Sequence, residues 1–258
     1  MLTKDTAICI RAVDYSETSQ VVTFFTRATG KIPAIAKGSK RPKSAFDGQI
    51  DVFSYGSIVF SEPSSEKLAT LTEFAQQPRF MYLSSSLLAF NCASFAAELI
   101  HHFTNEYDPH PQLFDHLLEF LQNIDELHAK AKKSKRQDVL ALLILFQLSL
   151  LKEIGLQPVL DACTNCKTRY ERPLPSQGQA SNEFYFSSSA NGLLCRNCES
   201  SFNDKMKLTK SAASCLTDFK LLAEADNKTL NEVERVLVYH FTELLGRPPK
   251  MANYILKN

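Results

Sequence analysis

The sequence predicts an α+β multidomain protein, with a small β-barrel at the N-terminus and then an all-helical domain into which a four-cysteine module is inserted. Three observations predict this class: short β-type runs fill the first 80 residues, amphipathic helical periodicity follows, and two CxxC pairs interrupt the later helices. With 258 residues, 44% of them hydrophobic, the chain can bury one large core or two smaller ones. We expect the barrel at residues 1–80 and the helical domain at 81–258, with the cysteine module at about 160–205.

Five β-type runs lie in the first domain, separated by clusters of turn-forming residues. They are TAICIRAV, QVVTFFT, GKIPAIAKG, IDVFSYGSIVF and KLATLTEF. Five short strands at this spacing are typical of a small closed barrel, and closure removes the exposed edges of the sheet. An OB-fold and an SH3-like barrel both fit this strand count.

After Pro78 the hydrophobic period changes to that of a helix, which predicts amphipathic helices at about 87–103 and 113–127. A third helix, at about 137–154, is apolar nearly all round and ends before Gly155, so we expect it at the centre of the helical domain. Thr229 and Glu232 form a capping box that predicts the start of a late helix, which Gly246 closes.

Charge and hydropathy narrow the class of protein. The 29 basic and 28 acidic side chains leave a net charge of +1, so attraction to a polyanion has to come from local clusters.

The most apolar stretch, Val139–Leu151, is too short to cross a bilayer, which takes roughly 20 residues. The N-terminal residues lack a secretory signal, so we expect a cytoplasmic protein in a reducing compartment.

Four of the seven cysteines form two CxxC pairs, Cys163 with Cys166 and Cys195 with Cys198. Two such knuckles can surround one tetrahedral zinc ion with four thiolates, and an Asn191-Gly192 turn predicts the hairpin that delivers Cys195. Unrelated buried cysteines and a redox-active CxxC are the alternatives, but no thioredoxin-type βαβ pattern surrounds either pair. We expect one structural zinc per chain, without an open coordination position for catalysis, and a polar loop at residues 173–183.

The strongest segregation of charge lies between Thr18 and Phe46, where no acidic residue occurs. Six cations lie there: Arg27, Lys31, Lys37, Lys40, Arg41 and Lys43. Because they flank two neighbouring predicted turns, we expect them to converge on one barrel face that binds phosphates without reading sequence. An ordinary solvated loop is the alternative. Tyr15, Phe24 and Phe46 are candidates to stack on bases, although aromatic residues in a small barrel are more often core.

No catalytic constellation can be assembled from the sequence. The chain lacks a GxxxxGK[ST] phosphate loop, HExxH and GxSxG, and His101 and His102 lie on a predicted helix without a third ligand. We therefore expect a binding protein, not an enzyme. Two alternatives are a zinc-ribbon and barrel factor that acts on RNA or in transcription, and a nuclease, for which no carboxylate cluster is evident.

Several segments resemble the RecO family of DNA repair proteins. They are IRAVDYSETSQVVTFFTRATGKIPAIAKGSKRPKS, LATLTEF, LLKEIGLQPVLDACTNC, GLLCRNC and LLGRPPK, and they cover nearly the whole chain in order. The resemblance implies an N-terminal OB-fold, a helical C-terminal domain and a zinc module, in a nucleoid-associated protein. The missing phosphate loop predicts that it uses no nucleotide cofactor. It also implies a recombination mediator that binds single- and double-stranded DNA and anneals complementary strands. Such a mediator works with RecR to load RecA onto DNA coated by single-stranded-DNA-binding protein (SSB).

Overall fold

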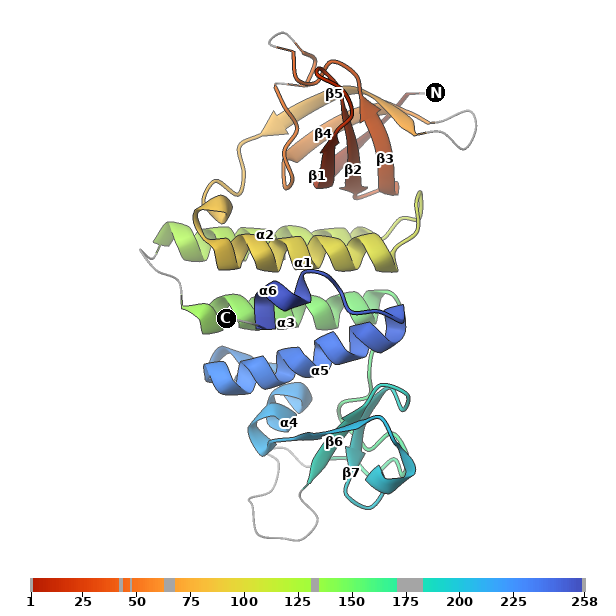
Figure 1. Ribbon diagram of the computed structural model, residues 1–258, viewed down its shortest axis with the longest axis vertical. Coiled ribbons are helices and arrows are strands. Elements are labelled where there is room, and N and C mark those ends of the chain that lie inside the picture. Colours follow the sequence, from red (N-terminus) through yellow and green to blue (C-terminus); the bar gives the residue numbers. More distant parts are fainter. Residues whose placement is uncertain are drawn as a thin grey trace. The chain divides into compact units, whose positions relative to one another are not determined.

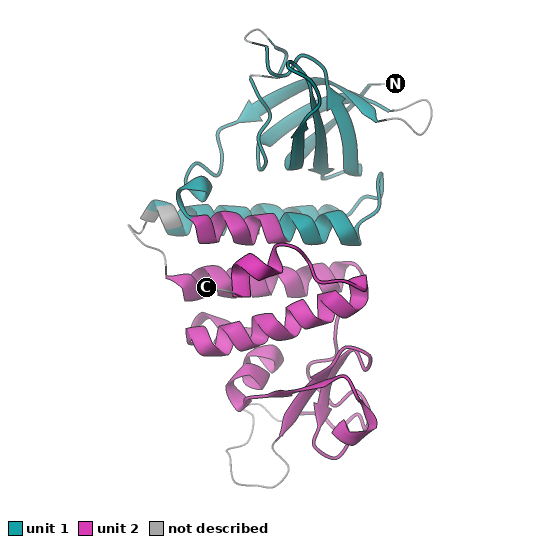
Figure 2. Ribbon diagram, viewed as in Figure 1, with its two compact units in different colours: residues 1–86, 96–130 teal, residues 87–95, 131–258 magenta. Residues whose placement is uncertain are grey.

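The computed structural model describes residues 2–41, 44–46, 48–62, 68–130, 135–170 and 183–256 (Figure 1). The chain divides into two compact units, coloured in Figure 2. Unit 1 contains Met1–Ser86 and Ala96–Lys130, and unit 2 contains Leu87–Phe95 and Ala131–Asn258. Helix α1, Leu87–Phe103, therefore contributes residues to both units.

A closed five-stranded barrel forms the N-terminal part of unit 1, as the sequence predicts. Its strands are β1 (Leu2–Asp14), β2 (Gln20–Thr26), β3 (Gly30–Ala36), β4 (Tyr55–Ser61) and β5 (Ala69–Gln77). They close in the order β1-β2-β3-β5-β4, in which only the contact of β3 with β5 is parallel. Alternate side chains such as Phe24, Ile32 and Phe74 fill the interior. The rings of Phe24 and Phe74 pack edge to face there, with their centroids 5.1 Å apart.

Strand β4 begins at Tyr55, so the expectation of a strand from Ile50 is wrong for its first five residues. Phe53 adopts a positive φ of 71°, which ends any extended run there. Its N–H donates to Cys9 O at 2.7 Å, and Ser54 O accepts from Cys9 N at 2.9 Å. These bonds hold the 50–54 segment against β1, and the buried Ile50 and Phe53 side chains explain its apolar sequence.

The hairpin of β2 and β3 is attached at one end to the connection between α1 and α2 (Pro111–Lys130). Gly30 has a φ of +82°, and a Cβ built there would lie 2.1 Å from Asp108 O, so only glycine fits. Next to it, Lys31 is 6% exposed and its Nζ donates to His101 O at 2.7 Å and to Thr104 O at 2.6 Å. The ammonium therefore satisfies carbonyls at the C-terminal end of α1, where positive charge is favoured.

Unit 2 consists of helices and a small sheet. Its helices are α3 (Arg136–Glu153), α4 (Lys210–Thr217), α5 (Asn227–Leu245) and α6 (Ala252–Leu256), and its strands are β6 (Phe184–Ser187), β7 (Gly192–Cys195) and β8 (Lys205–Leu208). Short 3-10 turns lie at Leu83–Ser85 in unit 1 and at Glu199–Ser201 and Phe219–Ala223 in unit 2. Helix α3 packs on α5, and ten of its residues are buried, in line with its apolar sequence. Within the described ranges, no helix has the length and hydropathy needed to cross a bilayer.

The start of α5 differs from the expected capping box. Asp226 is the N-cap, and its carboxylate accepts from Thr229 N at 2.8 Å. Glu232 instead accepts from Thr209 N and Thr209 Oγ1, each at 2.7 Å, while Thr209 caps α4. The capping-box prediction is therefore wrong, because an acidic residue three positions earlier begins the helix. Gly246, at a φ of +68°, does close α5 as predicted.

A buried carboxyl group lies between α3 and α5. Glu234 is fully buried, and its Oε1 accepts from Gln147 Nε2 at 2.9 Å. Burial raises the pKa of Glu234 from 4.5 to about 7, although the Gln147 amide and the Arg136 charge act in the opposite direction. Glu234 Oε2 and Gln147 Oε1 both lack a hydrogen-bond partner among the described residues. A neutral acid therefore fits this buried position better than a carboxylate, whose charge would be poorly compensated.

Replacing Lys31 with methionine should lower the free energy of unfolding by about 2 kcal/mol, because charge-assisted hydrogen bonds to two carbonyls are lost. Urea denaturation followed by circular dichroism measures this change. The control is Lys37→Met, which removes an exposed ammonium and should change stability by no more than about 0.5 kcal/mol. Equal losses in the two variants would contradict the anchoring role of Lys31.

Glu234 should make the protein less stable as pH rises. Because its pKa is higher in the folded state, the folded protein holds a proton that the unfolded chain has lost, and stability falls between about pH 4.5 and 7. Glu234→Gln keeps the shape and removes the titration, so at pH 8 it should be more stable by as much as about 3 kcal/mol. Urea denaturation at pH 5 and pH 8 tests this, with the exposed Glu224→Gln as control. A parallel pH dependence in parent and variant would refute it.

Candidate metal centre and nucleic-acid interface

The four predicted cysteines come together in unit 2. The Sγ atoms of Cys163, Cys166, Cys195 and Cys198 all lie within 4.8 Å of one another, and those of Cys166 and Cys195 are 3.8 Å apart. A tetrahedral zinc site with Zn–S bonds of about 2.3 Å has sulfur–sulfur edges of roughly 3.8 Å. All four are free thiols. The donor set and its spacing therefore fit one tetrahedral metal ion with four sulfur ligands.

Two tight turns position these sulfurs. In the first, Cys163 O accepts from Lys167 N and Cys163 N donates to Thr168 O, each at 2.9 Å, and Lys167 adopts a φ of 62°. In the second, Cys198 N donates to Cys195 O at 3.1 Å, at the end of β7. Cys195 N also points at Cys163 Sγ, 3.4 Å away. Backbone N–H groups directed at sulfur are the contacts that stabilise metal-bound thiolates.

The thiol groups differ in their surroundings. Cys163 is fully buried and Cys166 is exposed. The Thr168 hydroxyl lies 3.3 Å from Cys166 Sγ, and hydrogen bonds from Thr168 and from the neighbouring cysteines lower the pKa of Cys166 to about 6. Cys9, Cys92 and Cys215 lie apart from this cluster and are buried, as their interpretation as apolar residues predicted. Burial raises the pKa of Cys9 to about 12, which keeps that thiol protonated.

The cysteine module is joined to α5 by a hydrogen-bonded carboxylate, Asp204. Its Oδ1 accepts from Ser187 Oγ at 2.8 Å, its Oδ2 accepts from Ser189 N at 2.9 Å, and Tyr239 OH on α5 also reaches it at 3.0 Å. Burial acts to raise the pKa of Asp204, but the bonds from Ser189, Ser187 and Tyr239 hold it well below its ordinary value. The module is thus attached through a fixed negative charge next to β6.

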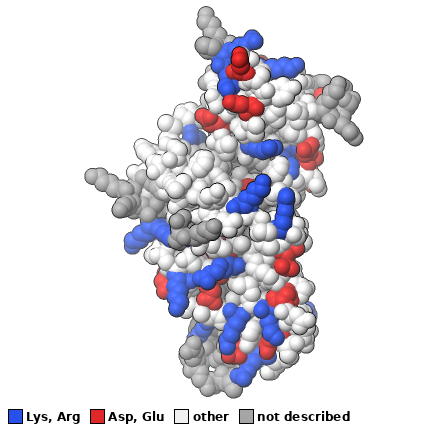
Figure 3. All heavy atoms as spheres, in the orientation of Figure 1, with Lys and Arg blue, Asp and Glu red and all other residues white. Residues whose placement is uncertain are grey.

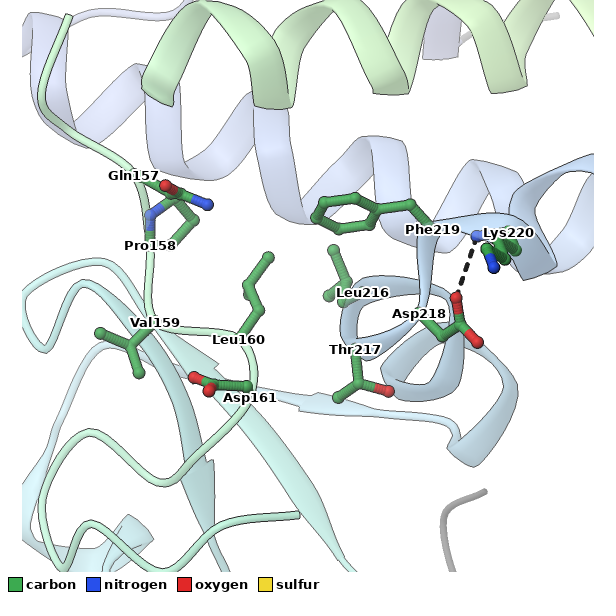
Figure 4. A pocket seen from close by; sticks show the side chains of 10 residues that line it. All are labelled: Gln157, Pro158, Val159, Leu160, Asp161, Leu216, Thr217, Asp218, Phe219 and Lys220. Carbon is green, nitrogen blue, oxygen red and sulfur yellow. Dashed lines mark hydrogen bonds between the residues drawn. The ribbon is translucent and has the colours of Figure 1, made fainter. Parts of the chain in front are cut away.

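A pocket of about 660 Å³ lies between the segment that leads into the first knuckle and the end of α4 (Figure 4). Leu160, Leu216 and Phe219 give it apolar walls. Asp161 and Asp218 contribute carboxylates and Lys220 one ammonium. Asp218 accepts from Lys220 N at 3.2 Å, so it caps the following 3-10 turn.

The six predicted cations do not share one surface. Thr26 pairs with Gly30 at one end of the β2–β3 hairpin, and Gln20 pairs with Ala36 at the other. Seven residues per strand separate these ends by roughly 20 Å. Arg27 and Lys31 therefore lie at the end attached to the helices, whereas Lys37, Lys40 and Arg41 lie beyond the opposite end. The expectation that all six converge is wrong, and Lys43 lies outside the described residues.

At the attached end neither cation is free. Lys31 is buried and its ammonium is bonded to the α1 carbonyls, so it is not available to a phosphate. Burial also lowers its pKa. Arg27 makes two bonds of 2.9 Å to Asp115 on α2. Both of those side chains remain about half exposed, so solvent screens the pair. Sequence reasoning missed Asp115 because it lies 88 positions further along the chain.

We call the opposite end of the hairpin, formed by residues 14–19 and 37–41, the open end. Ser39 is buried and donates to Gln20 Oε1 at 3.0 Å. Lys40 N donates to Thr18 O at 3.1 Å, and Gly38 N to Ser19 Oγ at 3.2 Å. These bonds fix the backbone of the loop after β3 against the β1–β2 turn.

Three cations lie on the open end. Lys37 and Arg41 are exposed, and Lys40 is half-buried. Lys40 Nζ pairs with Asp14 Oδ2 at 2.7 Å, and Glu17 adds a second carboxylate to the same turn. Cations and carboxylates are intermingled on the face drawn in Figure 3 as well. With a net charge of +1, attraction to a polyanion can therefore come only from local clusters of cations.

Two protein-family models match the chain in sequence order. "Recombination protein O N terminal" matches residues 1–77, and "Recombination protein O C terminal" matches residues 84–252, which is more than half of the chain. The chain belongs to the RecO family of DNA repair proteins. In the RecO family the N-terminal domain is an OB-fold, so the barrel is of that kind and the SH3-like alternative falls away.

Curated RecO proteins are similar over most of the chain. "DNA repair protein RecO" of Bacillus pumilus (strain SAFR-032) is 30% identical over 253 residues, which cover 95% of this chain and 90% of that protein. The protein of the same name from Rhodopirellula baltica is 32% identical over 225 residues, or 87% of this chain and 77% of that protein. A third, from Bacillus subtilis (strain 168), is 32% identical over 198 residues, which cover 77% of this chain and 69% of that protein.

Some features of this RecO chain escape the sequence patterns. Strand β8 pairs with β6 and continues to Leu208, beyond the expected end of the cysteine module near 205. The alternation in KMKL is its only signal, and four residues are too few to distinguish a strand from a loop. Of the polar loop expected at 173–183, only Glu183 lies within the described residues.

The cysteine geometry predicts one metal ion per chain in protein purified without chelator. Cys163→Ser should lose the ion and lower the melting temperature, because one of four ligands that close the module is gone. Elemental analysis and thermal melts measure both effects. Cys215→Ser, at a buried cysteine outside the cluster, should keep the ion. Parent protein without bound metal would contradict the site.

Proposed function

We propose that this protein is a recombination mediator that binds single- and double-stranded DNA, anneals complementary strands and, with RecR, helps to load RecA onto SSB-coated DNA. Membership of the RecO family over both domains carries this proposal. The barrel, residues 1–80, is the proposed DNA-binding domain, and residues 81–258 are the proposed helical domain.

The open end supports a DNA-binding role by its charge and its fixed backbone. Lys37, Lys40 and Arg41 lie on one loop, and Lys43 follows them in sequence. Phosphates bound there release condensed counterions, which gives affinity without sequence readout. The pair of Lys40 with Asp14 is only partly buried, so a phosphate can replace the carboxylate at little cost.

The proposed activity needs no chemical step. Annealing requires that two strands be held close with their charges screened, and cations supply this without a nucleophile or a general base. Among the described residues the metal-ligand cluster is all-thiolate, and a closed site with four cysteine ligands has no position for a reacting water. A nuclease would cleave labelled single strands with magnesium, so cleavage by the pure protein would overturn the non-enzymatic role.

Zinc is the metal we assign to the four cysteines, as a structural ion. Tetrahedral all-sulfur sites suit Zn²⁺, and such sites contribute to folding. Cys163, Cys166, Cys195 and Cys198 would hold it and keep the β6–β7 hairpin attached to the first knuckle. Because the knuckles lie in unit 2 and the open end in unit 1, loss of the metal should affect stability more than DNA affinity.

RecR and SSB are proposed as partners on the strength of the family resemblance. An acidic, phenylalanine-ended tail of SSB would need an apolar groove bordered by Lys or Arg. The pocket in Figure 4 has apolar walls, but two carboxylates and one ammonium line it. That balance opposes an acidic peptide, so we do not assign the tail to this pocket.

Reversing Lys40 and Arg41 to glutamate should weaken binding to every DNA sequence alike and slow annealing of SSB-coated strands. Two lost phosphate contacts should reduce the salt slope on single strands by about 1.4. Fluorescence anisotropy across a salt series, together with an annealing assay on pre-coated DNA, measures both. Asp14→Asn should instead strengthen DNA binding, because it removes the carboxylate that competes with a phosphate for Lys40.

The matched control is the double reversal of Lys220 and Lys228, two exposed lysines in unit 2, which changes the total charge equally. It should leave affinity and slope close to those of the parent. Equal effects of the two double reversals would place the binding surface elsewhere. Failure of the parent to anneal coated DNA would contradict the mediator role, and a preference for matched RNA over DNA would favour an RNA-binding factor.

A further inference from the structure

We propose that Tyr15 stacks on a nucleobase and makes the open end prefer single-stranded over double-stranded nucleic acid. This inference rests on the proposed DNA-binding function and adds a specificity-determining residue to it. Cations alone bind both forms, because both present phosphates. A residue that contacts the face of a base distinguishes them, since duplex bases already stack on their neighbours.

Burial selects Tyr15 from the three aromatic candidates on the barrel. Phe24 is 0% exposed and Phe46 is 4% exposed, and both belong to the barrel core. Tyr15 is 67% exposed. Within the described part of the chain its hydroxyl has no hydrogen-bond partner and its ring has no aromatic or cationic neighbour. Its ring is therefore available to a base, whereas the other two rings are committed to packing.

The backbone under Tyr15 is held in place. Tyr15 N donates to Ser19 O at 2.9 Å, and Ser16 N to the same oxygen at 3.2 Å. Ser16 Oγ accepts from Ser19 N at 3.2 Å. The turn is thus closed from both sides, and binding does not have to order it. A fixed platform loses less entropy when a flexible single strand binds.

The same turn positions Tyr15 beside the cations. Thr18 O accepts from Lys40 N, and Ser19 Oγ accepts from Gly38 N, so the turn and the cationic loop form one hydrogen-bonded unit. Asp14, which precedes Tyr15, pairs with Lys40 Nζ at 2.7 Å. An aromatic ring next to phosphate-binding cations is the arrangement that single-strand-binding surfaces use.

The outer face of the barrel continues this surface away from the turn. Val13 pairs with Val21, which pairs with Ile35, and directly paired residues place their side chains on one face. Their neighbours Ala12, Val22 and Ala34 pack on the inside. Val13 is 46% exposed, and Val21 and Ile35 are half-buried. These three side chains offer apolar contact to the unstacked bases of a single strand. The phosphates and sugars on the outside of a duplex gain no such contact, so the surface favours a single strand.

Two carboxylates, Asp14 and Glu17, flank Tyr15, and they are the features that would suit a basic protein partner instead. The pairing of Asp14 with Lys40 reduces the negative charge beside the ring. Lys37 and Arg41 remain exposed on the adjoining loop. Cations outnumber carboxylates on the open end, so the surface favours a nucleic acid over a basic protein.

The test uses the full-length protein and three variants. Tyr15→Ala should lower affinity for a single-stranded oligonucleotide roughly tenfold, with the affinity for a duplex and both salt slopes unchanged. Tyr15→Phe should bind like the parent, because the ring is kept. Tyr82→Ala, at a second exposed tyrosine of unit 1, is the control and should change neither affinity.

Because the chain contains no tryptophan, Tyr15→Trp provides a direct optical readout. Its fluorescence should be quenched by single-stranded oligonucleotide and much less by duplex, whereas Tyr82→Trp should respond to neither. Equal losses of single-strand and duplex affinity in Tyr15→Ala, or an unquenched indole signal from Tyr15→Trp at saturation, would overturn the proposal.

Two other results separate this inference from the proposed function. If the parent protein binds no DNA, the proposed function itself fails. If Tyr15→Ala binds DNA like the parent but no longer anneals SSB-coated strands, the ring contacts a protein, and stacking on a base is refuted.

Discussion

The burial of Lys31 against the C-terminal end of α1 is the constraint that decides which end of the β2–β3 hairpin a ligand can reach. A buried ammonium persists only where acceptors replace its water, and His101 O and Thr104 O do so at 2.7 and 2.6 Å. Gly30 adds a contact with Asp108 that no side chain can make. With one end of the β2–β3 hairpin attached in this way, the other end is where a ligand can meet this hairpin's cations.

The sequence predicted the barrel, the long helices and the cysteine cluster, because each depends on local regularities. Short β-type runs between turn-forming clusters define β2 and β3, and helical periodicity defines α1 and α2. A CxxC pair brings two sulfurs together by its own geometry. A hairpin that ends at Cys195 brings the second CxxC pair to the first. The Asn191-Gly192 turn predicted that hairpin, which β6 and β7 form.

The roles of individual charges could not be read in the same way, because their partners are distant in the sequence. Arg27 and Lys37 look alike in a charge plot, but Asp115 on α2 pairs with only the first. Glu232 has the spacing of a capping box, yet Asp226 begins the helix and Glu232 binds Thr209 instead. A sequence window shows that a group is charged, and only tertiary structure shows which partner satisfies it.

The same distinction explains how a nearly neutral protein can have a nucleic-acid surface. A cation buried like Lys31 cannot leave its partners without exposing unsatisfied carbonyls, so it serves the fold. A cation paired at the surface like Lys40 can exchange Asp14 for a phosphate, because water screens both states. The carboxylate keeps the unbound loop ordered, and its displacement reduces the net gain on binding. In the proposed function, such a surface would hold DNA weakly enough to release it to a partner.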